Sequence, residues 1–226
     1  MSYTIESIAE CIGARRVGEC EATIDWLLTD SRSLSFPEET LFFALTTKRN
    51  SGARYIPDLY DRGVRNFVVT EEDFEKFKNG ELGKLSTLNF LIVANPLKAL
   101  QKLAEIHREE FKIPIIGITG SNGKTIVKEW LHQLLSPDRR IVRSPRSYNS
   151  QIGVPLSVWQ LNEEAELGIF EAGISEMGEM NALKRMIKPT IGILTNIGGA
   201  HQENFFSLQE KCMEKLTLFK DCDVVI

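Results

Sequence analysis

A glycine-rich segment, residues 120–125, contains the residue types that bind nucleotide phosphates. It reads Gly-Ser-Asn-Gly-Lys-Thr. Glycines let backbone N–H groups close around phosphate oxygens, and the N-terminus of a following helix adds partial positive charge. Lys124 can reach the β- and γ-phosphates of a nucleotide, and the Thr125 hydroxyl can ligate Mg²⁺. The segment therefore predicts a phosphate-binding loop.

The residues on either side of this loop predict a strand before it and a helix after it. An apolar, β-branched run at 115–118 leads into the loop, and apolar residues recur at helical spacing as far as residue 135. The general pattern G-x-x-x-x-G-K-[ST] has glycine where this chain has Ile118, and the first loop glycine here is Gly120. Gly-Lys-Thr also occurs in ordinary turns, but the order strand, loop, helix favours nucleotide binding.

The composition limits the class of protein. The chain has 226 residues, of which 42% are hydrophobic and 26% charged, which is typical of one large globular domain or two smaller ones. The net charge is -4 and no dense Lys/Arg block occurs, so nothing indicates a nucleic-acid partner. Cysteines at 11, 20, 212 and 222 are scattered, which indicates reduced thiols. There is no signal peptide and no long apolar stretch, so we expect a cytoplasmic protein without a membrane span.

Strands and helices alternate along the chain, which predicts an α/β fold with a substantially parallel sheet. We expect strands near residues 22–28, 40–45, 66–70, 89–94, 115–118, 140–143, 166–170, 190–195 and 223–226. We expect helices near residues 4–14, 55–62, 96–111, 124–135, 152–161, 179–187 and 207–219. Lys112-Ile-Pro114 reads as a short hinge, so we place a domain boundary there, with domains at 1–112 and 113–226.

Two side chains at predicted strand ends are candidate ligands. Glu171 ends an apolar strand, where a phosphate-loop fold can use a carboxylate to hold Mg²⁺; alternatively it is a solvent-exposed acid. His201 lies in a glycine-rich turn after the strand at 190–195, at the sheet edge where α/β proteins bind ligands, although a lone histidine is more often not a ligand. His107 and His132 fall within helices, so we expect surface or boundary residues.

Other candidates have ordinary explanations when each is taken alone. Lys215 lies on an amphipathic helix, where a lysine is usually solvated. Asp30-Ser31-Arg32 is compatible with a simple polar turn, and Asn149 lies in a polar loop.

Taken together, these positions resemble the Mur ligase family, and the resemblance covers essentially the whole chain. The segments that carry it are Thr29–Arg32, Thr119–Thr125, Tyr148–Pro155, Glu171–Glu179, Thr195–Glu203 and Glu214-Lys215. The resemblance implies an N-terminal α/β domain that binds a UDP-linked substrate. A P-loop-type ATPase domain with a parallel sheet follows it. The chain ends on the first residues of an apolar strand, so this second domain looks truncated.

The activity that the resemblance implies is ATP-dependent formation of an amide bond in peptidoglycan precursor synthesis. The family phosphorylates a carboxylate with the γ-phosphate of ATP, and an amine then attacks the acyl phosphate. The segments around Asn149 and at 200–203 favour the member that adds D-alanyl-D-alanine to UDP-N-acetylmuramoyl-tripeptide. We expect the fragment alone to be inactive, and a version fused to alanine racemase has the same order of motifs.

Three alternatives stay open. One is the sibling ligase that adds the third peptide residue. Another is the related folate-polyglutamate ligase, against which the segment Asp30-Ser31-Arg32 argues, since that enzyme has no UDP-binding module. The third is a P-loop nucleotide-binding protein without ligase chemistry. Glu171, His201 and Lys215 together argue against this last alternative.

The resemblance also implies roles for single residues. The ATP-binding residues are Gly120, Ser121, Asn122, Gly123, Lys124 and Thr125. Thr125 and Glu171 would hold one Mg²⁺, and His201 with Glu171 a second. Lys215 matches a lysine that the family carbamylates, which turns the amine into a metal ligand; Lys211, one helical turn away, is the competing assignment.

The catalytic set is therefore Lys124, His201 and Lys215. On the substrate side, Asp30, Ser31 and Arg32 would contact the UDP moiety, and Asn149 would line the muramoyl-peptide side of the cleft.

Overall fold

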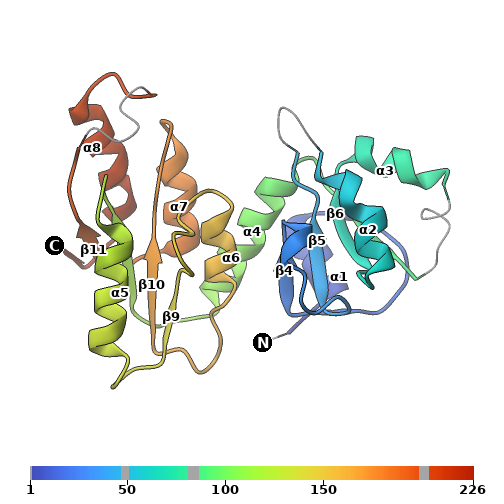
Figure 1. Cartoon of the computed structure of the whole chain (residues 1–226), viewed down its shortest axis with the longest axis horizontal. Helices are drawn as coiled ribbons and strands as arrows, with labels where there is room; N and C mark the ends of the chain where they lie inside the picture. The colour runs from blue at the N-terminus through green and yellow to red at the C-terminus, as the bar shows by residue number, and fades with distance from the viewer. Residues whose placement is uncertain (1, 47–50, 81–86, 199–203) are drawn as a thin grey trace. The chain divides into compact units, whose positions relative to one another are not determined.

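The computed structural model describes residues 2–46, 51–80, 87–198 and 204–226 (Figure 1). The chain forms two compact units, Met1–Leu103 and Ala104–Ile226. The division falls within helix α4 (Pro96–Glu109), whereas the sequence places the domain boundary after that helix. The boundary at residues 112 and 113 stays a prediction about the functional domains. None of the helices in the described ranges is both long and apolar enough to span a bilayer.

The first unit is built on a sheet that, in the described residues, has five strands in the order β2-β7-β6-β5-β4. The strands are β2 (Arg15–Val17), β4 (Trp26–Leu28), β5 (Thr40–Phe43), β6 (Asn66–Val69) and β7 (Asn89–Ile92). The strands from β4 to β7 pair in parallel, and β2 pairs antiparallel with β7 at one edge. Phe42, Phe67 and Phe90 lie in the apolar core, where Phe67 stacks on Phe90 with a ring-centroid distance of 5.7 Å.

Short helices complete this unit. They are α1 (Ile5–Ile12), η1 (Ser31–Ser33), η2 (Gly52–Tyr55), α2 (Ile56–Asp61) and α3 (Glu71–Lys78). Helix α1 confirms the helix predicted over residues 4–14: the Thr4 hydroxyl caps its N-terminus, and Gly13 ends it with φ 64°.

The sequence prediction differs from this unit in several places. The strand expected over 22–28 is two strands, because β3 (Thr23–Ile24) pairs with β1 (Tyr3–Thr4) while β4 pairs with β5. Strands β1 and β2 and helix α3 were not predicted. Helix α3 carried a usable signal, since Thr70 caps it and three acidic residues occupy its first turn.

The second unit confirms the predicted parallel sheet. Its order in the described residues is β12-β11-β8-β10-β9, and all of these pairings are parallel. The strands are β8 (Ile115–Thr119), β9 (Ile141–Arg143), β10 (Leu167–Glu171), β11 (Ile191–Leu194) and β12 (Val224–Val225). The helices are α5 (Lys124–Leu135), α6 (Gly153–Val158), α7 (Glu179–Ile187), α8 (Leu208–Leu216) and the 3₁₀ turn η5 (Thr217–Phe219).

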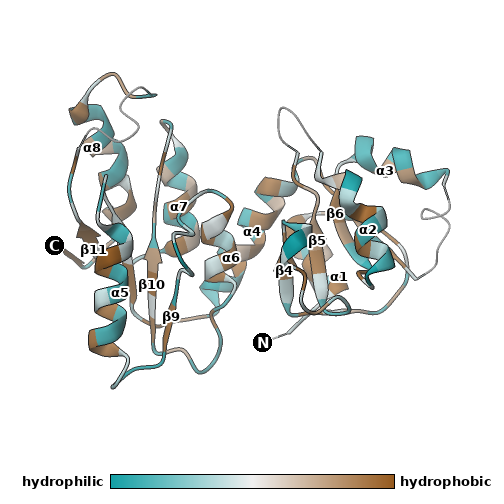
Figure 2. Ribbon diagram, in the orientation of Figure 1, coloured by the Kyte–Doolittle hydropathy of each residue, from teal (hydrophilic) through white to brown (hydrophobic). Residues whose placement is uncertain are grey.

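Helix α5 covers one face of this sheet. Val127, Leu131 and Leu135 pack against apolar side chains of β8 and β10, whereas Trp130 and Leu134 are exposed. Figure 2 shows hydrophobic and hydrophilic residues interleaved along α5, as expected for a helix that packs by one face. Apolar residues of α6, α7 and η5 form a separate core with side chains from the sheet.

Parallel pairing brings the chemically important segments to one edge. Glu171 at the end of β10 pairs in register with Ile118 of β8, and Leu194 of β11 pairs with Thr119. The three strands therefore finish level, and the segments that follow them start side by side.

His107 on α4 is buried, so the prediction of a surface or boundary residue is wrong for it. Its side chain is only 2% exposed, and its Nε2 lies 3.0 Å from the Leu161 carbonyl oxygen. The rings of Phe111 and Trp159 pack against it. Burial lowers the pKa of His107 from 6.5 to about 4, so the neutral imidazole is the stable form in the folded chain. His132 is partly buried, as expected.

This burial predicts a pH-dependent stability. The stabilisation from neutral His107 is complete above pH 6.5, the unfolded value, and is lost as the pH falls towards about 4, because the unfolded chain then binds one more proton. We expect this group to cost about 2 kcal/mol of unfolding free energy between pH 7.5 and 5. Urea unfolding at both pH values should show a smaller loss in His107→Gln than in His132→Gln. An equal loss in the two variants contradicts the prediction.

Candidate active site

The predicted phosphate loop connects β8 to the N-terminus of α5. Gly120 and Gly123 adopt φ values of 146° and 82°, which favour glycine. Gly123 is the N-cap of α5 and has no side chain to cap it, so the first N–H groups of the helix point out of its N-terminus. This is the arrangement that binds anions in phosphate loops.

The segment after β11 supports the loop from one side. The Thr195 hydroxyl donates to the Asn122 carbonyl at 2.6 Å, and the Asn196 side-chain oxygen accepts from the Asn122 N–H at 3.1 Å. The Ser121 hydroxyl accepts from the Gly198 N–H at 2.9 Å. Sequence analysis assigned no role to Thr195 and Asn196, although they belong to a segment that carries the family resemblance.

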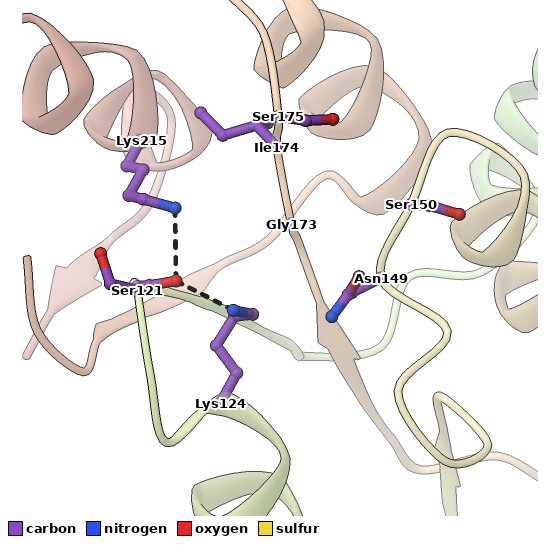
Figure 3. Close-up of a pocket in the computed structure, with 9 residues that line it drawn as sticks. Ser121, Lys124, Asn149, Ser150, Gly173, Ile174, Ser175 and Lys215 are labelled. Atoms are coloured by element: carbon purple, nitrogen blue, oxygen red, sulfur yellow. Dashed lines mark hydrogen bonds between the residues drawn. The ribbon is translucent and has the colours of Figure 1, made fainter. Parts of the chain in front are cut away.

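Two lysine side chains meet at the Gly120 carbonyl oxygen. It accepts hydrogen bonds from Lys124 Nζ at 2.9 Å and from Lys215 Nζ at 3.2 Å, and both bonds are drawn in Figure 3. Lys215 is only 3% exposed, which excludes the ordinary alternative of a solvated lysine. Lys211 is also buried, and its Nζ donates to the Gly198 carbonyl at 2.7 Å.

The pKa values of these amines reflect burial and mutual repulsion. Burial, with Lys124 and Lys211 nearby, lowers the pKa of Lys215 to about 8. Burial also lowers the pKa of Lys124, although the Glu171 carboxylate acts against this. The Lys215 amine therefore loses its proton more readily than an ordinary lysine.

Glu171 is fully buried at the end of β10, which excludes the alternative of a solvent-exposed acid. Its Oε2 accepts a hydrogen bond from the Thr125 hydroxyl at 3.1 Å and a long one from Asn149 Nδ2 at 3.5 Å. The structure therefore brings together Thr125 and Glu171, which the sequence paired as metal ligands.

Lys128 is a site residue that sequence analysis missed. Its Nζ lies 3.0 Å from Glu171 Oε1, and both side chains are 0% exposed. Although this distance suits an ion pair, Oε1 receives no well-aligned hydrogen bond from the described residues. A signal was present in the sequence, since Lys128 follows Lys124 by one helical turn and so lies on the same side of the helix.

A cavity of about 160 Å³ opens beside the loop (Figure 3). Its lining residues are Gly120, Ser121, Lys124, Asn149, Ser150, Gly173, Ile174, Ser175 and Lys215. This volume is below the roughly 300–1,000 Å³ of a complete ligand pocket, so it suits phosphate and carboxylate groups better than a whole nucleotide. Asn149 is held here because its carbonyl oxygen accepts from the Gly173 N–H at 2.7 Å.

The remaining predicted site residues are not among those that line this cavity. Asp30, Ser31 and Arg32 belong to the first unit, where Arg32 pairs with Asp30 at 2.6 Å. The hydrogen bond from Arg32 lowers the pKa of Asp30. Ser31 is buried, and its carbonyl oxygen accepts from Arg62 at 2.8 Å. His201 lies outside the described residues; within those residues, no group of three or more His, Cys, Asp or Glu side chains could hold a metal ion.

The close approach of Gly120 to Thr195 generates a prediction. A Cβ on Gly120 would lie 1.9 Å from the Thr195 hydroxyl oxygen, in a backbone conformation that other residues rarely adopt. We expect Gly120→Ala to cost at least about 1–3 kcal/mol of unfolding free energy, from backbone strain alone. Gly198→Ala is the control, because its Cβ would meet only contacts of 3.8 Å. Chemical denaturation compares the two, and equal stability would contradict this description of the loop.

Comparison with known proteins points to one family. Residues 118–225 match the Mur ligase middle domain. Two curated relatives are named UDP-N-acetylmuramoyl-tripeptide–D-alanyl-D-alanine ligase. The protein of Treponema pallidum is 41% identical over 225 residues, covering 97% of this chain and 48% of the relative. That of Borreliella burgdorferi is 36% identical over 200 residues, covering 86% of this chain and 42% of the relative.

Solved structures share the fold. A crystal structure of MurF from Acinetobacter baumannii superposes with a TM-score of 0.83 at 22% identity, covering 98% of this chain and 47% of that one. The MurF ligase of Thermotoga maritima in complex with ADP superposes with a TM-score of 0.72 at 25% identity, covering 88% of this chain and 43% of that one. The chain thus spans less than half the length of these relatives. Family match, sequence identity and fold agree that the chain belongs to the Mur ligase family.

Proposed function

We propose that this chain is the UDP-substrate domain and part of the ATP-binding domain of a ligase that joins D-alanyl-D-alanine to UDP-N-acetylmuramoyl-tripeptide. The observation that carries the proposal is the convergence of the phosphate loop, Glu171 and Lys215 at one sheet edge, around a cavity lined by Lys124 and Lys215. The names of the curated relatives support this choice of substrates.

In the proposed reaction, ATP phosphates bind the N–H groups of the loop, and Lys124 exchanges the Gly120 carbonyl for a phosphate oxygen. The terminal carboxylate of the tripeptide attacks the γ-phosphorus, and ADP leaves. The amine of D-alanyl-D-alanine then attacks the acyl carbon, loses a proton, and releases inorganic phosphate. The lysines of the cavity reduce the repulsion between the two anions that must meet.

The oxygen atoms beside the loop fit Mg²⁺, which prefers oxygen ligands. Thr125 Oγ1 and Glu171 Oε2 are 3.1 Å apart, and both would contact one ion. Magnesium would neutralise charge on the phosphates. A second ion held by Glu171 and His201 is proposed from the family resemblance.

We assign carbamylation to Lys215 in preference to Lys211. The neutral amine forms an N–C bond to CO₂ and loses a proton, which leaves a carboxylate-like group able to bind a metal. The pKa of about 8 supports this chemistry for Lys215, whose side chain also lines the cavity. Lys211 instead donates to the Gly198 carbonyl and is not among the lining residues.

The substrate contacts proposed for the first unit fit its surface. The Arg32 side chain is 88% exposed and pairs with the nearby Asp30, so it can exchange that partner for a phosphate of UDP. Asn149, at the cavity, is proposed to contact the peptide part of the same substrate.

The test of the function uses the complete protein that carries this chain. Phosphate release from ATP with UDP-N-acetylmuramoyl-tripeptide should require D-alanyl-D-alanine, and Lys124→Ala should lower kcat by about 100-fold or more, because one charged group at the transferred phosphate is lost. Lys220→Ala, an exposed lysine, is the control. Release that depends on a single amino acid instead would overturn the choice of substrate.

Carbamylation can be tested on the chain itself. With ¹³C-bicarbonate at pH 8, we expect one carbamate carbon signal in the NMR spectrum. It should disappear in Lys215→Gln and persist in Lys211→Gln, because the neutral amine of Lys215 is the reacting group. A signal lost only in Lys211→Gln would reverse the assignment, and a signal retained in both variants would refute it.

A further inference from the structure

The ammonium group of Lys128 lies among polar groups from three separate segments. Its Nζ donates to the carbonyl oxygens of Ser144, at 2.8 Å, and Arg146, and it is 3.0 Å from Glu171 Oε1. Glu129 Oε1, at the edge of the group, is 3.2 Å away. Lys128 is not among the residues that line the cavity, so it does not face the reacting groups.

The free-energy cost of burying the Lys128 ammonium group must be offset by other interactions or by a function. Removing an ammonium group from water costs several kcal/mol, and an apolar pair of similar volume is often at least as stable as a buried ion pair. Lys128 and Glu171 are both 0% exposed, so both charges carry this cost. The pair is therefore poorly explained by stability alone.

The two oxygens of Glu171 have different partners. Oε1 faces Lys128, and Oε2 accepts from the Thr125 hydroxyl. The backbone is held as well, because the Glu171 N–H donates to the Ser144 hydroxyl at 3.2 Å while the Ser144 carbonyl accepts from Lys128. The carboxylate is thereby fixed with one oxygen directed at the loop threonine.

The same ammonium group also holds the turn that precedes Asn149. Arg146 adopts a left-handed φ of 49°, a conformation that costs of order 1–3 kcal/mol outside glycine and persists only where neighbours enforce it. The hydrogen bond from Lys128 to the Arg146 carbonyl is such a constraint. Helix α5, which starts in the phosphate loop, is thus connected to the segment carrying Asn149.

We propose that Lys128 is a positioning residue that holds Glu171 so that only Oε2 can ligate the nucleotide-bound cation, and that it joins the Asn149 segment to the nucleotide-binding helix. The inference rests on the proposed function, since it assigns Glu171 to the cation. Charge alone makes the opposite prediction: removing a positive group beside a metal site should strengthen cation binding. Positioning predicts that cation binding weakens, because Glu171 loses its fixed orientation.

The experiment uses the complete protein that carries this chain and measures how Mg²⁺ changes its affinity for ADP, by calorimetry in Mg²⁺ and in EDTA. We expect the wild-type protein to bind ADP more tightly with Mg²⁺. In Lys128→Met this enhancement should fall at least tenfold, while affinity in EDTA stays within twofold, because the loop itself is unchanged. Lys220→Met, at an exposed lysine, should match the wild type.

A stability measurement identifies Glu171 as the partner through which Lys128 acts. Lys128→Met should lower the melting temperature by leaving a buried carboxylate unpaired, and Lys128→Met/Glu171→Gln should recover part of that loss. If Lys128→Met does not fold, Lys128→Arg decides, because it keeps the charge and changes the geometry. We expect at least a threefold loss of the Mg²⁺ enhancement in that variant.

The possible results test the positioning role of Lys128 and the cation site separately. In one result, the wild-type protein shows the Mg²⁺ enhancement of ADP affinity and the Lys128 variants show an equal or larger one. That result overturns the positioning role and leaves the proposed function standing. A wild-type protein whose ADP affinity does not respond to Mg²⁺ overturns both the cation site and the role of Lys128. Absence of any recovery in the double variant removes Glu171 as the partner.

Discussion

The parallel pairing of β8 with β10 and β11 is the constraint on which the candidate site depends. Because the strands run in the same direction, their carboxyl ends and the segments that follow lie at one edge. The glycine loop, Glu171 and the Thr195–Gly198 segment are therefore brought together by backbone hydrogen bonding before any side chain contributes. The close approach of Gly120 to Thr195 is possible only because residue 120 has no Cβ.

The charged side chains at this edge of the sheet then determine which ligands and reactions suit it. Lys124 and Lys215 converge on one carbonyl oxygen, Lys211 lies close by, and Lys128 is paired with the buried Glu171. Such a concentration of cations is compatible with the proposed meeting of two anions, ATP and a carboxylate. Burial and the repulsion from neighbouring lysines also lower the pKa of Lys215 to about 8, which supports the proposed reaction of its amine with CO₂.

Local patterns predicted much of this molecule because they depend on neighbours in the chain. The glycines of the loop, the helix at 179–187 and the strand ending at Glu171 were all predicted from spacing and residue type, and the structure has them at those positions. The prediction was wrong where distant residues decide the environment. His107 is enclosed by Trp159, far along the chain, and residues 22–28 are divided between two sheets.

By itself, the sequence determined the α/β class, the position of the phosphate loop and the family, since these follow from short-range periodicity and from motifs in a fixed order. Only the tertiary structure decided the environment of each charge. It buried Lys215, separated it from Lys211 by its contact with Gly120, and placed Lys128 against Glu171. Desolvation and charge pairing depend on atoms that are close in space but far apart in the chain, and residue spacing does not encode them.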